Sequence, residues 1–326
     1  MSASLRNAGS RRFVATLIAS LALTVAADAQ SYPDRPVKLV VAFPTGSGAD
    51  LLVRLFGEKL AVVSGATVVV ENRPGANGNI GHDYVAKSRP DGYTVLLGAS
   101  TNMAGNPLIF KDVPWDAVRD FEPVTTLAQL GFVLTISAKS TAGTIAEFTQ
   151  AMKAKGGRAT FGYGNTTGLA SSSLYAAEAG FQATSVSYKS GPQTVSDVVA
   201  GQVDFTFADF IFALSQEKQG GVRLLAVTTP KRSPTLPNVP TMAESGLPGA
   251  TIAPWWAAFV PAKSPPEVIA KLAGWFDKIV EMSETREALL KQGVQTLPGS
   301  AALARQMLKE TQADWARIIK IAKIEP

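Results

Sequence analysis

The chain has 326 residues, 46% of them hydrophobic, and a formal net charge of +5 at neutral pH. It contains no cysteine, which excludes disulfides, thiolate nucleophiles and cysteine-ligated metal sites. Without a predicted leader that carries three Arg and one Asp, the net charge is +3, and no basic stripe is interleaved with aromatic residues. These features argue against a nucleic-acid partner.

The N-terminal segment is typical of an export signal. Arg11 and Arg12 precede the apolar run "FVATLIASLALTVA", and "ADA", ending at Ala29, supplies the small-x-small pattern of a signal peptidase site. The apolar run is shorter than the roughly 20 residues that a membrane-spanning helix needs. We therefore predict that residues 1–29 are a leader that is cleaved near Ala29 after export by the Sec or the Tat route.

After the leader, β-type runs alternate with helix-like runs. The predicted strands occupy residues 37–43, 67–71, 93–98, 123–137, 159–163, 183–188, 203–207, 222–228 and 251–260. The predicted helices begin near Asp50, Ile80, Thr144, Thr167, Pro192 and Asp209. Alternation at this spacing favours parallel α/β sheets over a barrel of hairpins.

Two stretches are candidates for crossings between domains. Residues 122–137 are too many for an ordinary single strand, and "APWWAAFVPAKSPP" (253–266) joins an apolar run to a proline-rich exit. Beyond this exit the pattern is wholly helical. We expect a discontinuous first lobe, residues 30–130 and 253–326, and a second lobe of residues 131–252.

Five polar turns follow predicted strands. They are "FPTGSGAD" (43–50), "GASTN" (98–102), "YGNTTG" (163–168), "YKSGPQT" (188–194) and "FADF" (207–210). Ligands of open α/β sheets gather outside the carboxyl ends of the strands, where such turns cluster. Hydroxyls, amides and backbone N–H groups with few charges suit reversible binding better than bond-making. Candidate ligand contacts at these turns are Phe43, Thr45, Ser100, Thr101, Tyr163, Tyr188, Phe207 and Asp209.

Other kinds of site fit the chain poorly. A phosphate-binding P-loop needs G-K-[ST] where "GSGADLL" has Asp50 and Leu51, and a dinucleotide fingerprint needs a third glycine. The only imidazole is His82, and no G-x-S-x-G elbow is present. We expect His82 to be a solvated residue in the first turn of a helix and Asp209 to suit a helix cap. We predict no catalytic residue, cofactor or metal.

Several segments, taken together, resemble one family. They are "YPDRPVKLVVAFPTGSGADLLVR", "VVVENRPGANGNIGHDYVAKSRPDGYTVLLG", "VSYKSGPQTVSDVVAGQVDFTF", "LLAVTTPKRSPTLPNVPTMAESGLPG" and "WARIIKIAKIEP". The chain is similar from about Tyr32 to Pro326 to the substrate-binding proteins of tripartite tricarboxylate transporters, the Bug-type receptors. The resemblance implies a type II periplasmic-binding-protein fold, in which two α/β lobes are joined by two crossing strands with the ligand cleft between them.

The resemblance also implies a function and a site. It implies a periplasmic receptor, not an enzyme, that captures a small carboxylate and delivers it to membrane permease subunits, and we expect a monomer. The ligand carboxylate would lie between two turns, with the amides of one and the side chains of the other facing it. These residues are Gly46, Ser47, Gly48 and Ala49 in the first turn and Asn165, Thr166 and Thr167 in the second. Asp50 is expected to cap a helix.

Some alternatives stay open at this point. The second turn lacks the histidine that is common in the family, so the resemblance does not fix the individual contacts there. The ligand stays open among dicarboxylates, tricarboxylates and aromatic carboxylates. Six aromatic residues could line an apolar slot or belong to the core: Phe205, Phe207, Phe210, Phe212, Trp255 and Trp256. A sensor subunit that presents ligand to a membrane kinase, or an exported enzyme that uses Asp204 or Asp209 with His82, are the other functions considered.

Overall fold

In the computed structural model, which describes residues 32–322 and 324, the strands form two sheets. The first sheet has the order β11-β4-β10-β3-β1-β2. Its strands are β1 (Val37–Val41), β2 (Val68–Asn72), β3 (Thr94–Ala99), β4 (Phe121–Leu130), β10 (Trp255–Pro261) and β11 (Val294–Thr296). The predicted leader and its cleavage site near Ala29 lie outside the described residues.

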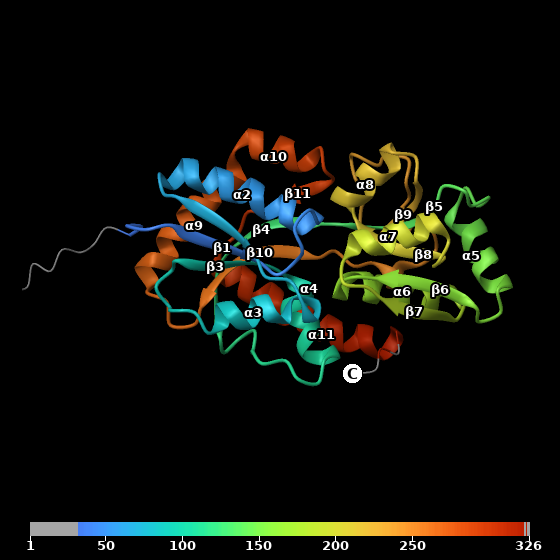
Figure 1. Cartoon of the computed structure of the whole chain (residues 1–326), viewed down its shortest axis with the longest axis horizontal. Coiled ribbons are helices and arrows are strands. Elements are labelled where there is room, and N and C mark those ends of the chain that lie inside the picture. The colour runs from blue at the N-terminus through green and yellow to red at the C-terminus, as the bar shows by residue number, and fades with distance from the viewer. Residues whose placement is uncertain (1–31, 323, 325–326) are drawn as a thin grey trace, which may run out of the picture. The chain divides into compact units, whose positions relative to one another are not determined.

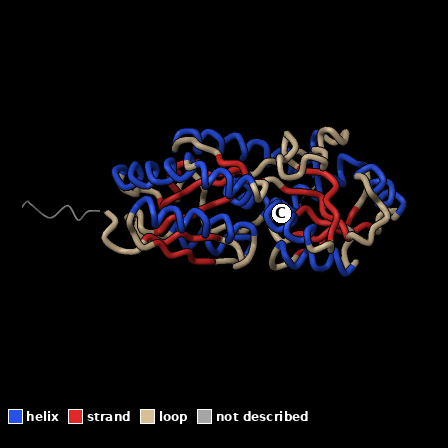
Figure 2. The backbone as a smooth tube through the Cα atoms, turned by 90° about the horizontal axis from the view of Figure 1, so that it is seen from above, coloured by secondary structure: helices blue, strands red, loops and turns tan. Residues whose placement is uncertain are grey.

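The second sheet has the order β7-β6-β8-β5-β9. Its strands are β5 (Phe132–Ser137), β6 (Ala159–Tyr163), β7 (Ala183–Ser187), β8 (Phe205–Asp209) and β9 (Val222–Val227). In Figure 2 the strands form two separate groups with helices around each. All these elements belong to one compact unit of the chain that begins at Arg35. The expected α/β architecture with two sheets is confirmed.

Both sheets are mixed: the parallel pairs expected from the sequence are present, and antiparallel strands are inserted beside them. Strand β1 pairs in parallel with β2 and β3, and β6 pairs in parallel with β7 and β8. By contrast, β10 is antiparallel to β3 and β4, and β5 is antiparallel to β8 and β9. The antiparallel strands are those near the two stretches predicted to cross between lobes. Alternation of strands and helices in the sequence does not reveal the direction of such inserted strands.

The long stretch predicted as one strand is divided at a single glycine. Strand β4 ends at Leu130 in the first sheet and β5 begins at Phe132 in the second, with Gly131 between them. The chain returns to the first sheet at β10. Just before this strand, Pro254 O accepts a hydrogen bond from the Leu130 N–H at 3.0 Å. The two strands lie side by side in the middle of Figure 1. The lobe boundaries at residues 130/131 and 252/253 remain a prediction.

Ten α-helices flank the sheets in the described part of the chain (Figure 1). They are α2 (Gly48–Ser64), α3 (Asn79–Ala86), α4 (Ser100–Ile109), α5 (Ile145–Ala154), α6 (Thr166–Ala179), α7 (Gly191–Ala200), α8 (Phe210–Lys218), α9 (Pro266–Glu281), α10 (Ser283–Leu290) and α11 (Ala301–Ala322). Two short 3₁₀ helices are η1 (Ala76–Gly78) and η2 (Pro248–Ala250). Within the described residues no helix is both long and apolar enough to cross a membrane.

Helix α4 was not predicted, because the sequence "GASTN" is typical of a turn. Its residues include Gly105 and Pro107, which are poor helix formers, and several Ser, Thr and Asn that favour caps and turns. Eight of its ten residues are nevertheless buried, so tertiary packing outweighs the weak local preference. The helix packs against α11, whose Trp315 is almost completely buried.

A glycine-to-alanine pair tests this packing. A Cβ on Gly105 would lie 2.8 Å from the Trp315 ring, whereas a Cβ on the exposed Gly274 of α9 meets open space. Both variants gain about 1 kcal/mol of helix propensity, but overpacking at Gly105 costs about 1–3 kcal/mol. Urea unfolding should therefore show Gly105→Ala less stable than Gly274→Ala. Equal free energies of unfolding would contradict the close approach of α4 and α11.

Candidate functional site

One pocket lies where five helices begin. Residues at or beside the N-termini of α2, α4, α6, α7 and α8 line it, together with apolar residues from the strands and loops between them. The lining residues are Phe43, Pro44, Ser47, Ala49, Ala99, Leu130, Phe132, Gly164, Asn165, Thr167, Gly191, Pro192, Asp209, Pro254 and Trp256. Its volume is about 40 Å³, enough for only a few water molecules.

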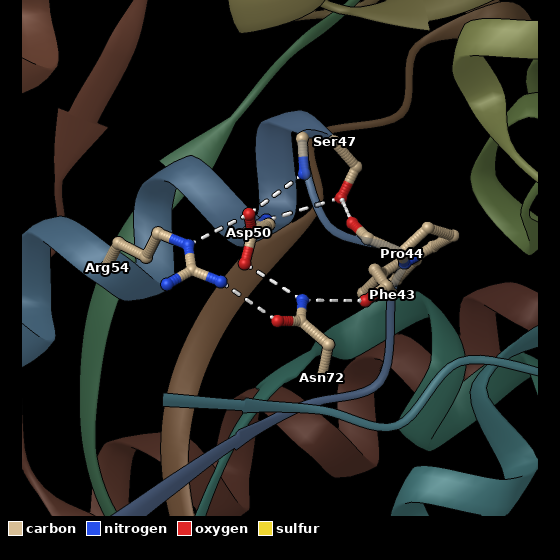
Figure 3. Close-up of polar contacts among 7 residues, drawn as sticks. Phe43, Pro44, Ser47, Asp50, Arg54 and Asn72 are labelled. Atoms are coloured by element: carbon tan, nitrogen blue, oxygen red, sulfur yellow. Dashed lines mark hydrogen bonds and ion pairs between the residues drawn. The ribbon is translucent and has the colours of Figure 1, made fainter. Parts of the chain in front are cut away.

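The α2 end of the pocket is shaped by the turn that opens the helix. Strand β1 ends at Val41, and the apolar residues of α2 recur at helical spacing, so the polar turn between them lies at the carboxyl end of the strand. Ser47 is the N-cap: its hydroxyl accepts from the Asp50 N–H at 3.3 Å and donates to Pro44 O at 2.7 Å (Figure 3). The first amides of α2, at Gly48 and Ala49, have no partner within the helix and are oriented toward its N-terminal end.

Asp50 holds this turn from inside. Its carboxylate accepts from the Gly46 N–H at 2.9 Å, Arg54 Nε at 3.0 Å and Asn72 Nδ2 at 2.8 Å (Figure 3). Asn72 also donates to Phe43 O at 3.1 Å, which ties the end of β2 to the turn. Burial alone would raise the Asp50 pKa, but the hydrogen bonds and charge of its partners outweigh it and lower the pKa. Asp50 is thus a structural carboxylate, and Ser47 rather than Asp50 caps the helix.

Only some of the backbone amides predicted to bind the ligand carboxylate remain available in this turn. The Gly46 N–H donates to Asp50, and the Ser47 N–H donates to Pro44 O at 3.2 Å. Two of the four amides expected to face a ligand are therefore already bonded within the turn. Gly48 and Ala49 are the candidates that keep a first-turn N–H for an anion.

In the second turn, Asn165 is the N-cap of α6, and its side chain accepts from the Gly168 N–H at 2.8 Å. The Thr166 hydroxyl donates to Asn106 Oδ1 at 2.6 Å, and the Thr167 hydroxyl donates to Thr101 Oγ1 at 2.8 Å. Both hydroxyls therefore connect α6 to α4 instead of pointing to the turn that opens α2. Of these residues, Asn165 and Thr167 line the pocket.

Most of the remaining residues predicted to contact the ligand lie outside the pocket. The Ser100 hydroxyl accepts from the Trp255 N–H at 3.1 Å, and Phe207 is buried beside Tyr175. The Tyr188 hydroxyl donates to Asp197 at 2.7 Å, and burial together with this carboxylate raises the Tyr188 pKa to about 12. The described lining of the pocket does not include Thr45, Gly46, Gly48, Ser100, Thr101, Tyr163, Thr166, Tyr188 and Phe207.

Asp209 is the only charged side chain among the described lining residues. It is the N-cap of α8, as its side chain accepts from the Phe212 N–H at 2.9 Å, which confirms its capping role. The surrounding protein desolvates the carboxylate, and this raises its pKa although backbone N–H groups at the start of α8 oppose the shift. The side chain is partly exposed, and its open side faces the pocket.

The expectation of a solvated His82 is wrong. Its side chain is fully buried, stacked on Trp115 with ring centroids 4.9 Å apart, and its Nδ1 lies 2.8 Å from Gly78 O. Burial lowers the His82 pKa to about 4, so the ring is neutral at ordinary pH. Asp204 is ion-paired with Lys155. Neither residue lines the pocket, so the constellation proposed for an enzyme is not assembled there.

The apolar wall of the pocket comes from residues far apart in the sequence. Phe43 and Trp256 have ring centroids 5.7 Å apart, and Phe132 at the start of β5 also lines the pocket. Of the six aromatic residues considered for a slot, only Trp256 is part of this wall. Sequence reasoning missed Pro44, Ala99, Leu130, Phe132, Gly164, Gly191, Pro192 and Pro254. Five of them lie within the polar turns described above, and Leu130, Phe132 and Pro254 lie in the two stretches predicted to cross between domains.

Comparison with known proteins identifies the family. The family model of the tripartite tricarboxylate transporter family receptors matches residues 52–324. This chain belongs to that family. A protein of Pseudomonas sp. (strain P51) from the tcbD-tcbE intergenic region is 34% identical over 325 residues, covering 97% of this chain and 95% of that protein. Protein BugT of Bordetella pertussis is 30% identical over 312 residues and covers 94% of both chains.

Solved structures agree with this assignment. The structure of R. palustris Rpa4515 with adipate has a TM-score of 0.88 and 30% identity, and covers 90% of this chain and 99% of that one. The periplasmic binding protein BugD has a TM-score of 0.85 and 27% identity over 90% of this chain and 99% of that one. The two-lobe fold inferred from the sequence is confirmed. The family consists of receptors, so the alternative of an enzyme is not supported.

Removing the Asp50 carboxylate should destabilise the turn. Asp50→Ala leaves the Gly46 N–H and the Asn72 amide without their acceptor, and we expect a loss of about 3 kcal/mol in the free energy of unfolding. The exposed Asp314→Ala is the control, with a change within about 0.5 kcal/mol. Because the folded-state pKa is lowered, the Asp50 contribution is complete above its ordinary pKa of 3.8 and is lost as pH falls through the lower value.

Denaturant unfolding at neutral pH and at pH 3 measures both effects. The difference between wild type and Asp50→Ala should be smaller at the lower pH. A difference that does not change with pH, or that equals the difference for Asp314→Ala, would show that Asp50 does not hold the turn as an ion.

Proposed function

We propose that this chain is a periplasmic receptor that binds the carboxylate of a small organic acid in the pocket between its two sheets. It would present the acid to membrane permease subunits of a tripartite tricarboxylate transporter. In the same proposal the leader of residues 1–29 directs export, the lobes divide at residues 130/131 and 252/253, and the receptor acts as a monomer.

The convergence of five helix N-termini carries this proposal. Each N-terminus contributes N–H groups that have no partner within the helix and a partial positive charge. Together they favour an anion in the pocket without a lysine or arginine, and no basic side chain is among the described lining residues. The nearby apolar wall of Phe43, Phe132 and Trp256 suits the carbon chain or ring of an organic acid.

The small volume of the pocket supports binding with movement of the lobes. Ligand pockets are usually larger than roughly 300 Å³, whereas this one is about 40 Å³. A six-carbon acid therefore requires the two sheets to separate before it enters. Gly131, the single residue between β4 and β5, is well placed to absorb such a hinge motion. The adipate found with the similar Rpa4515 makes dicarboxylates the first ligands to test.

Gly48→Ala tests the position of the site. A Cβ on Gly48 would overlap Asp209 Oδ1, so the extra methyl group would push the start of α2 away from the start of α8. We expect affinity for the bound acid to fall at least tenfold, which corresponds to about 1.4 kcal/mol. Calorimetry with adipate, malate, citrate and benzoate would measure it, with Gly274→Ala as a control that binds like wild type.

Two results would count against the proposal. If none of the organic acids gave a calorimetric signal with the wild type, the receptor function itself would lose its support. If an acid bound equally well to wild type and to Gly48→Ala, the binding site would lie elsewhere.

A further inference from the structure

Two carboxylates, that of Asp209 and that of the ligand, would lie at the same anion site of the pocket. Asp209 Oδ1 lies directly against Gly48, since even a methyl group on Gly48 would overlap this oxygen. The first-turn amides of α2, at Gly48 and Ala49, are the candidates for binding the ligand carboxylate, because the other two amides of the turn are bonded within it. An acid bound there would therefore place its carboxylate next to the Asp209 carboxylate.

Few charges nearby could separate these two anions. On α2, Asp50 is already paired with Arg54. On α7, Asp197 is bonded to the Tyr188 hydroxyl, and Lys189 before this helix is exposed. Strand β5, which pairs with Asp209 through Phe132, contains no charged residue, and the first two turns of α6 and α8 contain none either.

Backbone amides alone cannot remove the conflict. The Asp209 carboxylate already accepts from the Phe212 N–H, so the dipole of α8 is committed to it. Two carboxylates that share one site without an intervening cation do not both stay ionised, and the affinity of one of them for a proton rises strongly. The molecule must therefore supply a proton, or the ligand must leave the amides of α2.

We propose that Asp209 takes up one proton when the acid binds, so that the Asp209 carboxyl and the ligand carboxylate share this proton across the start of α2. This inference rests on the proposed receptor function. The proton comes from hydronium or the protonated buffer: its bond to that donor breaks, the O–H bond of the shared carboxyl forms, and release of the acid returns the proton to the buffer. The affinity for the acid is consequently higher at lower pH. Asp209 favours ligands whose carboxylate accepts a hydrogen bond from the protonated Asp209 carboxyl.

The state of Asp209 without ligand is consistent with this coupling. Desolvation at the pocket already raises the pKa of its carboxyl above the ordinary value of 3.8. A second carboxylate beside it acts in the same direction, because the protonated form removes the repulsion. Both effects therefore favour proton uptake by Asp209 when the acid binds.

Calorimetry in paired buffers measures the proton directly. Adipate, or the panel acid that binds most tightly, is titrated at pH 7.5 in phosphate and in Tris, whose ionisation enthalpies differ, so that the difference in observed heat gives the protons taken up. We expect close to one proton per ligand for the wild type and an affinity that falls up to tenfold per pH unit above this pH. For Asp209→Asn we expect no proton uptake and an affinity that is independent of pH.

The variants separate this effect from a structural one. Asn and Ser are as good as Asp at an N-cap, so Asp209→Asn and Asp209→Ser preserve the start of α8. Asp197→Asn removes another carboxylate of the same lobe, and its proton uptake should equal that of the wild type. Uptake lost in both Asp209 variants and kept in Asp197→Asn supports the proposal.

Other outcomes overturn it. If the acid binds without proton uptake, Asp209 stays ionised and the inference is wrong, although the receptor function stands. The same holds if aspartate binds more tightly than succinate and without proton uptake, because Asp209 would then pair with the ligand ammonium. Absence of binding by every acid would instead remove the proposed function itself.

Discussion

The convergence of helix N-termini on one small pocket is the constraint on which the rest of the site depends. Parallel strands deliver their carboxyl ends to the same edge of a sheet, and each helix that follows begins there. Helices α2 and α4 begin at such edges in the first sheet, and α6, α7 and α8 do so in the second. Because each helix contributes the positive end of its dipole, the site is cationic in effect although no lysine or arginine lines the described pocket.

Two carboxylates respond to this environment in opposite ways. Asp50 accepts hydrogen bonds from Arg54, Asn72 and the Gly46 N–H, and these partners lower its pKa. Asp209 has only backbone donors and a desolvated position, and its pKa is raised. The difference lies in the partners, since both residues stand at the N-terminal ends of helices, Asp50 in the first turn of α2 and Asp209 as the N-cap of α8. Asp50 therefore serves as a fixed charge that shapes the turn, and Asp209 is free to respond to a ligand.

The sequence predicted those parts of the site that local patterns determine. Strand-turn-helix junctions at residues 43–50, 163–168 and 207–210 follow from apolar runs, capping residues and glycines that are close in the chain, and all three reach the pocket. Of the expected caps, Asp209 caps α8, whereas Ser47 takes the place of Asp50 at the start of α2. The lobe boundaries and the individual ligand contacts stay predictions.

Contacts between distant residues were beyond such patterns. The Asn72–Asp50 and Thr166–Asn106 hydrogen bonds join residues 22 and 60 positions apart, and each decides where a predicted site residue points. The burial of His82 in α3 depends on Trp115, which belongs to the loop between α4 and β4. Helix α4 was missed for the same reason, because its packing against α11 replaces the local preference that its sequence lacks.

The pocket and the crossing between the sheets are connected through two consecutive residues. Asp209 faces the pocket, and the next residue, Phe210, donates its N–H to Gly131 O at 3.1 Å. The Phe210 ring occupies the space that a side chain at Gly131 or Gly293 would need, so both positions require glycine. Any displacement of Asp209 by a ligand therefore acts on the start of α8 and, through Phe210, on the residue where the chain passes from one sheet to the other. In the proposed receptor, Phe210 would thus connect a charge change at Asp209 to the crossing between the sheets.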